Sequence, residues 1–212
     1  MSGSGPPDLS ALVSARLCHD LVSPLGAIGN GIELIQMAGP GRGGGEAELA
    51  LISDSLTNAI GKLKFLRVAF GPADPEARQT FEETAAITSA AFQGRFSVTW
   101  THISGAMPRP LAKAIFLALL CLERSLPLGG EVRVDVGEEG AAALSMDGRR
   151  TAAPAELWAH VAEGAALDAV TSDMVQFTLL RRCLDDLEGR IDVAFAETGV
   201  ELRIGIPVTA PA

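Results

Sequence analysis

The sequence predicts an α+β fold in which a helical hairpin precedes an α/β sandwich with helices on one face of a mixed sheet. In the first part, apolar residues recur at spacings of three and four over two long stretches, which is typical of helices that pack in a bundle. In the second part, alternating stretches and helical stretches follow one another, which is typical of layered strands and helices. We place the hairpin domain over residues 1–72 and the sandwich domain over residues 73–212.

The first helix is predicted from about Asp8 to Ala38, and the second from Glu46 to Phe70. The segment between them, residues 39–45, is rich in glycine, contains a proline and cannot continue a helix. Two helices joined by one turn form an antiparallel hairpin. The predicted seam consists of Ala11, Ser14, Cys18, Leu21, Leu25, Ile28, Ile32 and Ile35 on the first helix, and of Leu49, Ile52, Leu56, Ala59, Leu63, Leu66 and Phe70 on the second.

Further apolar residues widen this stripe on both helices: Leu12, Leu17, Val22 and Ile60. A stripe this wide cannot be buried within one hairpin. The simplest solution is a four-helix bundle formed by two hairpins across a two-fold axis, so we expect a homodimer.

The second part is expected to contain four helices and five strands. The helices are predicted over residues 81–92, 110–126, 154–163 and 172–187. The strands are predicted over residues 96–103, 131–136, 141–146, 191–196 and 200–206, and the last two form a closing hairpin.

The composition indicates a folded protein without a membrane span. Hydrophobic residues make up 48% of the 212 residues, and no apolar run approaches the roughly 18 residues that a span requires. The first seven residues do not resemble a signal segment, so we expect a cytoplasmic protein. Cys18, Cys121 and Cys183 are odd in number and far apart, which argues against a disulfide framework and against a zinc or other metal site.

The net charge of −9 disfavours nucleic acids and anionic membranes as partners. The acidic excess lies in the sandwich domain. Basic and acidic residues number five and six up to Pro72, and twelve and twenty after it.

The candidate functional site is the run from Cys18 to Leu25, in which His19 is followed by Asp20. A side chain that carries a phosphoryl group must be nucleophilic and exposed, and it needs a neighbour that fixes its tautomer. An imidazole beside a carboxylate meets these needs. His19 follows the seam residue Cys18, so it is turned about 100° away from the core stripe. The alternative is a surface histidine without a role.

Pro24 removes the amide that would bond the carbonyl of Asp20 one turn earlier, so we expect a kink in the helix just beyond His19. Val22 and Ser23 precede this kink and are candidates for contact with a partner.

Basic residues are also expected near His19. Arg16 lies one turn before it, and Lys62, Lys64 and Arg67 lie on the part of the second helix that passes it in an antiparallel hairpin. Such side chains could stabilise a phosphoryl group or bind acidic residues of a partner. The alternative is a solvated basic helix face.

The run from His19 to Ile28 resembles the phospho-acceptor box of two-component histidine kinases and phosphotransferases, His-Asp/Glu-Leu-x-x-Pro-Leu-x-x-Ile, with every fixed position matched. The resemblance implies that His19 is the phospho-acceptor. It also implies that Asp20 orients the imidazole or contacts an incoming group.

The sandwich domain is similar to the ATP-binding domain of histidine kinases, but it departs from that domain at three places. The string from Leu126 to Val132 matches the end of the first nucleotide-binding box, which puts Leu117 and Cys121 where kinases carry asparagines, one of them a magnesium ligand. The adenine-binding box is reduced to residues 146–150. Met174 and Gln176 stand where the lid has glycines that approach phosphates, so the resemblance implies a domain without kinase activity.

A phospho-acceptor hairpin joined to such a domain is similar to the ChpT-type histidine phosphotransferases of alphaproteobacterial phosphorelays. The runs from Arg16 to Asp20 and from Arg67 to Gly71 contribute to this similarity, which covers nearly the whole chain. It implies that His19 takes a phosphoryl group from a phospho-aspartate on the receiver domain of a hybrid histidine kinase. It implies delivery to the aspartate of response-regulator receivers, with no cofactor in this chain because the receiver brings Mg²⁺.

Two alternatives remain at this point. The chain could be a scaffold or decoy that binds receiver or kinase domains without turnover, although the intact histidine box argues against this. It could be a kinase with a diverged nucleotide pocket, although the residues at the three departures argue against that. His102 and His160 have no such box around them, and we expect structural or surface roles for both.

Overall fold

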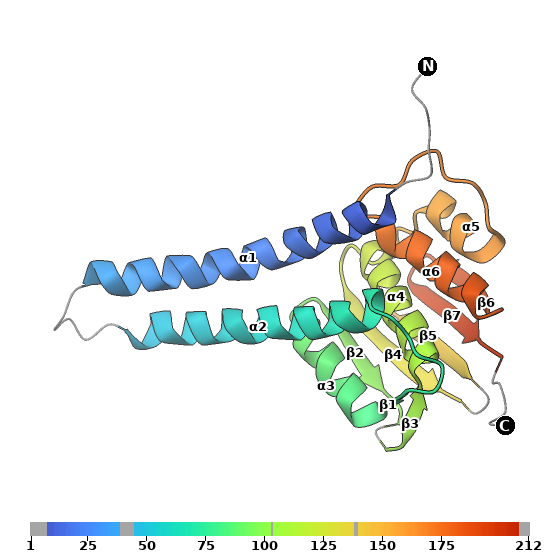
Figure 1. The fold of residues 1–212 in the computed structure, drawn as a ribbon, viewed down its shortest axis with the longest axis horizontal. Helices are drawn as coiled ribbons and strands as arrows, with labels where there is room; N and C mark the ends of the chain where they lie inside the picture. The colour runs from blue at the N-terminus through green and yellow to red at the C-terminus, as the bar shows by residue number, and fades with distance from the viewer. Residues whose placement is uncertain (1–7, 39–44, 103, 138–139, 208–212) are drawn as a thin grey trace.

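The computed structural model describes residues 8–38, 45–102, 104–137 and 140–207. A long helical hairpin projects from an α/β part (Figure 1). The hairpin consists of α1 (Leu9–Ala38) and α2 (Glu46–Phe70). The α/β part follows in the order β1 (Arg78–Thr80), α3 (Phe81–Ala91), β2 (Phe96–Trp100), β3 (Ala106–Pro108), α4 (Arg109–Ser125), β4 (Gly130–Val136), β5 (Ala141–Asp147), α5 (Ala155–Glu163), α6 (Val175–Asp186), β6 (Arg190–Ala196) and β7 (Gly199–Gly205).

Local side-chain chemistry sets several helix ends. At the start of α1, the backbone N–H groups of Ser10 and Ala11 donate to Oδ1 of Asp8 at 3.1 and 3.2 Å. At the start of α3, the backbone N–H of Glu83 donates to Oγ1 of Thr80 at 3.2 Å. These caps explain why the predicted and observed starts of both helices agree within one residue.

The structure differs from the predicted elements by more than one residue at three places. The short strands β1 and β3, which pair with each other, were not predicted because three residues are too few to show alternation. The strand predicted over 96–103 ends at Trp100, and residue 103 lies outside the described residues. The helix predicted from residue 172 starts at Val175, because residues 171–174 form a turn in which the N–H of Met174 donates to the carbonyl of Thr171.

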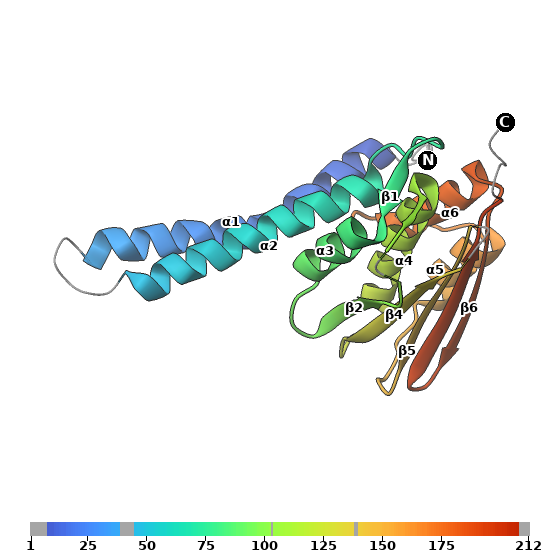
Figure 2. The same cartoon turned by 90° about the horizontal axis from the view of Figure 1, so that it is seen from below.

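The main sheet has the strand order β2-β4-β5-β7-β6, with β2 and β4 parallel and the other pairs antiparallel. Its strands bury every second residue, so that one face of the sheet packs against the helices and the other is exposed. Figure 2 shows α3 and α4 between the hairpin and the sheet. The predicted mixed sheet with helices on one face is therefore confirmed.

The last turns of α2 belong to the core of the α/β part. Phe65 stacks on Phe116 of α4 at a centroid distance of 4.5 Å, and it meets Phe92 edge-on at 4.9 Å. The carbonyl of Gly71, directly after α2, accepts a hydrogen bond from Nζ of Lys113 in α4 at 2.8 Å. The hydrophobic core thus continues across the predicted domain boundary at residue 72.

Within the hairpin, only part of the seam that we predicted on α1 is shielded from water: Leu21, Ile28 and Ile35 are half-buried. Pro24 and Gly31 are buried, and a Cβ at Gly31 would lie 2.6 Å from Cγ1 of Ile52. Leu25 and Ile32, which we placed on the seam, are 56% and 44% exposed. The reason is that small residues allow the closest approach of two helices, so the glycine edge faces α2 and the leucine edge is left outside. Of the predicted turn at residues 39–45, residues 39–44 lie outside the described residues.

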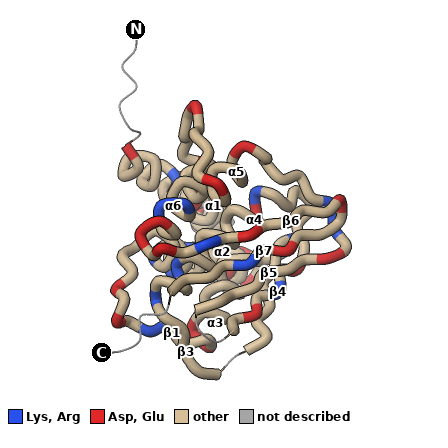
Figure 3. Tube along the Cα trace, turned by 90° about the vertical axis from the view of Figure 1, so that its right-hand side faces the viewer, with Lys and Arg blue, Asp and Glu red and all other residues tan. Residues whose placement is uncertain are grey.

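Charged residues of both signs are interspersed over the end of the α/β part that faces the viewer in Figure 3. Among the described residues, no helix is long and apolar enough to cross a membrane.

The contact between α2 and α3 yields a stability prediction. A Cβ at Gly61 would lie 2.6 Å from the carbonyl oxygen of Ala90, so Gly61→Ala must push the two helices apart. We expect this variant to lose about 1–3 kcal/mol of unfolding free energy in urea denaturation followed by circular dichroism.

The matched control is Gly26→Ala, where nothing lies within 4 Å of the added Cβ. It should gain up to about 1 kcal/mol through helix propensity. Equal stability of the Gly61→Ala variant and the parent chain would contradict the close packing of α2 on α3.

Candidate functional site

His19 lies on the outside of α1, and its side chain is 83% exposed. Its Nδ1 is 3.1 Å from Oδ1 of Asp20. A carboxylate can only accept a hydrogen bond, so the proton between the two atoms belongs to Nδ1. In the neutral ring, Nε2 is then the nitrogen that carries the free lone pair.

Asp20 is held from its other side by Arg16. Nε of Arg16 donates to Oδ2 of Asp20 at 2.8 Å, across one turn of α1. The side chains of Arg16 and Asp20 are only 15% and 16% exposed. Because each carboxylate oxygen has its own partner, the carboxylate has a defined orientation beside the exposed imidazole.

Arg16 also reaches the α/β part. Its Nη1 donates to the backbone carbonyl of Asp173 at 3.1 Å and lies 3.4 Å from Oε1 of Gln176. The sequence predicted that Arg16 lies near His19, but it indicated no role at the site for Asp173. Gln176 was noted only because it stands where the lid of a kinase has a glycine. No local pattern reveals these contacts, because the partners are 157 and 160 residues apart in the chain.

The other basic residues predicted near His19 separate into two places. Lys62 lines a cavity of about 80 Å³ together with Arg16, Asp20 and Glu123. Lys64 and Arg67 instead line a groove between α2 and α3, so the structure does not bring Arg67 to the cavity beside Asp20.

The carboxyl group of Glu123 contributes to the electrostatics of this cavity. Desolvation at the cavity wall raises the pKa of Glu123, and the charges of Arg16 and Lys62 partly oppose this effect. The cavity thus combines two basic side chains with the carboxyl groups of Asp20 and Glu123.

The residues that follow His19 present an exposed surface. Val22, three residues after His19, is 66% exposed, and Ser23 is also exposed. Helix geometry places both on the same side of α1 as His19. Pro24 is buried, and α1 continues through it as one helix; the kink that we expected stays a prediction.

At two of the three departures from a nucleotide site, the residues belong to the packed interior, whereas residues 147–150 of the third are exposed. Leu117 and Cys121 are completely buried in α4, and burial raises the pKa of the Cys121 thiol well above its usual value. Gln176 is also buried, and Met174 packs against the core. No group of three acidic, histidine or cysteine side chains that could hold a metal occurs among the described residues.

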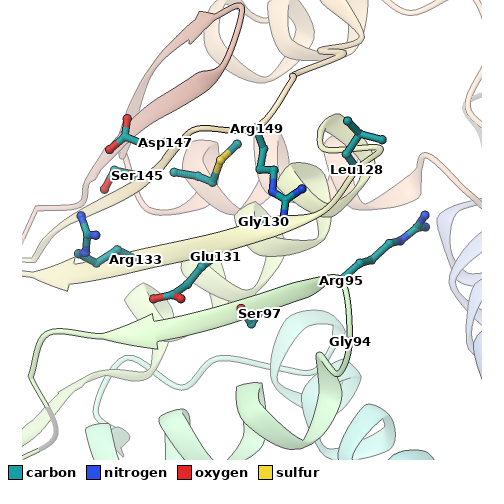
Figure 4. Close-up of a pocket in the computed structure, with 11 residues that line it drawn as sticks. Gly94, Arg95, Ser97, Leu128, Gly130, Glu131, Arg133, Ser145, Asp147 and Arg149 are labelled. Atoms are coloured by element: carbon teal, nitrogen blue, oxygen red, sulfur yellow. The ribbon is translucent and has the colours of Figure 1, made fainter.

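A separate hollow of about 480 Å³ lies on the open face of the sheet (Figure 4). Arg95, Arg133 and Arg149 line it together with Glu131 and Asp147. None of the predicted site residues lines this hollow, so it is distinct from the surroundings of His19.

The other two histidines make local contacts. Nδ1 of His102 lies 3.3 Å from Oδ1 of Asp135, and Nδ1 of His160 lies 2.7 Å from the carbonyl oxygen of Ala165. These contacts agree with the structural or surface roles expected for both residues.

Comparison with known proteins assigns the chain to a family. The profile described as "Histidine phosphotransferase C-terminal domain" matches residues 81–199. The protein phosphotransferase ChpT of Brucella abortus is 35% identical over 129 residues, a stretch that spans 60% of this chain and 60% of that protein.

Solved structures give a second comparison. A structure described as a bacterial phosphotransferase superposes with a TM-score of 0.79 at 25% identity, covering 96% of this chain and 98% of the other. A histidine kinase domain from Erythrobacter litoralis gives a TM-score of 0.41 at 14% identity, covering 77% of this chain and 88% of the other. The chain belongs to the histidine phosphotransferase family that the matching profile describes.

Proposed function

We propose that this chain is a phosphorelay histidine phosphotransferase that moves a phosphoryl group between receiver domains through His19, without ATP. The observation that carries the proposal is the exposed imidazole of His19, whose Nδ1 contacts a carboxylate that is itself held by an arginine. The Brucella relative is named a protein phosphotransferase, which supports the same activity here.

In the proposed reaction, the lone pair of His19 Nε2 attacks the phosphorus of an aspartyl phosphate. A bond from nitrogen to phosphorus forms, the bond from phosphorus to the aspartate oxygen breaks, and the carboxylate leaves with the electron pair. The ring gains positive charge, which the Asp20 carboxylate beside Nδ1–H stabilises. In the second transfer, an aspartate oxygen of another receiver attacks the phosphorus and Nε2 leaves.

The contacts of Arg16 favour a positioning role for this residue. Its Nε donates to Asp20 and its Nη1 to the α/β part, so Arg16 orients the carboxylate instead of pointing freely toward an incoming phosphoryl group. Lys62 is proposed to add positive charge beside Asp20. Arg67, Val22 and Ser23 are proposed contacts of the docked receiver.

The proposed partners are the receiver domain of a hybrid histidine kinase and the receivers of response regulators. A receiver would supply the Mg²⁺ that neutralises charge on the phosphoryl group, so this chain would need neither metal nor nucleotide. Its own residues position the nucleophile, which is the main requirement of such a transfer.

We also propose that the hairpin dimerises as a four-helix bundle. Leu25 and Ile32 on α1 are exposed and seven residues apart, and so are Leu49, Leu56 and Leu63 on α2. Exposed apolar residues at this interval form a continuous stripe that a second hairpin can cover.

The first prediction from the proposed function concerns the nucleophile. A purified receiver carrying phospho-aspartate should transfer acid-labile phosphate to the chain without ATP, and His19→Ala should abolish this transfer. The control, His102→Ala, removes an imidazole near the sheet and should leave transfer unchanged. If His19→Ala supported relay flux as well as the parent chain while receivers still bound, the chain would be a scaffold.

The second prediction concerns the carboxylate. Asp20→Asn keeps the shape of the side chain but removes the charge that stabilises the phosphorylated ring. We expect the rate of transfer at saturating receiver to fall roughly 10- to 100-fold, with little change in receiver affinity by calorimetry. An unchanged rate would show that Asp20 is a bystander.

The third prediction concerns assembly. Leu56→Lys places a charge in the exposed apolar stripe and should convert a dimer to a monomer, measured by light scattering after gel filtration. The control is Asp54→Lys, which introduces the same side chain about 200° away around α2 and should leave the dimer intact. A monomeric parent chain would refute the proposed bundle.

A further inference from the structure

We propose that Gln176, at the start of α6, is a positioning residue for phosphoryl transfer, acting on His19 through Arg16 and Asp20. The inference deepens the proposed function and rests on it. The effect of Gln176 on the tautomer of the His19 ring can nevertheless be measured without any phosphoryl transfer. The sandwich domain would then take part in the chemistry by fixing the nucleophile, besides any role in binding partners.

Gln176 reaches Arg16 by two routes. Its Oε1 lies 3.4 Å from Nη1 of Arg16, a long hydrogen bond. Its Nε2 donates at 2.9 Å to the carbonyl of Asp173, and that same carbonyl accepts from Nη1 of Arg16 at 3.1 Å. The amide therefore fixes both acceptors that the guanidinium group meets on the α/β part.

The anchor for this contact is rigid. Gln176 is 1% exposed, and its neighbours Val175 and Phe177 are completely buried in the core. Asp173 is held in turn by the Thr171 hydroxyl, which donates to its Oδ1, and by Arg124, whose Nη2 is 3.5 Å from its Oδ2. The hydrogen bond from Thr171 is the main factor that lowers the pKa of Asp173, so its carboxylate stays charged opposite Arg124.

From this anchor, contacts between neighbouring groups lead to the nucleophile. Arg16 links the carbonyl of Asp173 to Oδ2 of Asp20, and Oδ1 of Asp20 lies beside Nδ1 of His19. Arg16 and Asp20 have few other hydrogen-bond partners available, because their side chains are largely shielded from water. Loosening Arg16 should therefore change the orientation of the Asp20 carboxylate and, with it, the tautomer of the ring.

The alternative is a purely structural role, in which Gln176 only supplies hydrogen bonds to polar groups where α1 meets α6. A structural role of that kind would affect stability but not the protonation pattern of an exposed imidazole. The state of the His19 ring therefore separates the two explanations.

The experiment uses Gln176→Met, which keeps the length of the side chain and removes both its acceptor and its donor. Nitrogen-15 NMR of the three histidines, with His19 assigned from the His19→Ala spectrum, reports the protonation of each ring nitrogen. We expect the Nδ1–H form of His19 to lose population in the variant. The rate of transfer from a phosphorylated receiver should fall roughly three- to tenfold, without a change in receiver affinity.

Thr178→Val is the matched control on the same helix. Oγ1 of Thr178 is buried and has no hydrogen-bond partner among the described residues, so its loss should leave the ring and the rate unchanged. A further control combines Gln176→Met with Asp20→Asn. If Gln176 acts through Asp20, it has no additional effect on the His19 tautomer in that background.

Two results would overturn the proposal. One is an unchanged His19 tautomer and transfer rate in a folded Gln176→Met variant. The other is a change in the His19 tautomer on Gln176→Met that is equally large in the parent chain and in the Asp20→Asn background. If the parent chain itself accepted no phosphoryl group, the proposed function would fail, whereas the tautomer measurement would still test the structural link from Gln176 to His19.

Discussion

The burial of the end of α2 in the α/β core is the constraint on which the rest of the structure depends. Phe65 is enclosed by Phe92 and Phe116, so the base of the hairpin and the first helices of the α/β part form one packed unit. This packing holds α1 against α6, because α1 lies along α2. A hairpin attached through a loose linker could not bring Arg16 to a fixed carbonyl on the other part of the chain.

On this packed base, a short polar series surrounds the exposed histidine. Hydrogen bonds between shielded charged groups are strong and directional, so a carboxylate held by two partners presents its oxygens in one orientation. The chemistry that we propose requires little beyond this, because phosphoryl transfer from an acyl phosphate depends mainly on position and charge. At two of the departures from a nucleotide site the residues fill the interior, and one of them, Gln176, contacts the arginine that orients the site.

Much of this architecture follows from sequence patterns. The bounds of α2 were predicted without error, and the longer strands were found, because long periodic segments reveal which face is buried. The seam on α1 was predicted only in part, since periodicity weighs large apolar residues and overlooks the close approach that Gly31 allows. The contact between His19 and Asp20 could be predicted because the two residues are adjacent in the chain. The contact of Arg16 with Gln176 could not, because only the tertiary fold brings them together.

The measurement that tests the central claim most directly follows a phosphoryl group through both transfers in one reaction. A receiver labelled with radioactive phosphate on its aspartate is mixed with an excess of a second receiver and a substoichiometric amount of this chain, without nucleotide. The account predicts that label moves to the second receiver over many turnovers, and that a transient acid-labile phosphate appears on the chain. Label that stayed on the first receiver, or reached the second at the same rate without the chain, would contradict it.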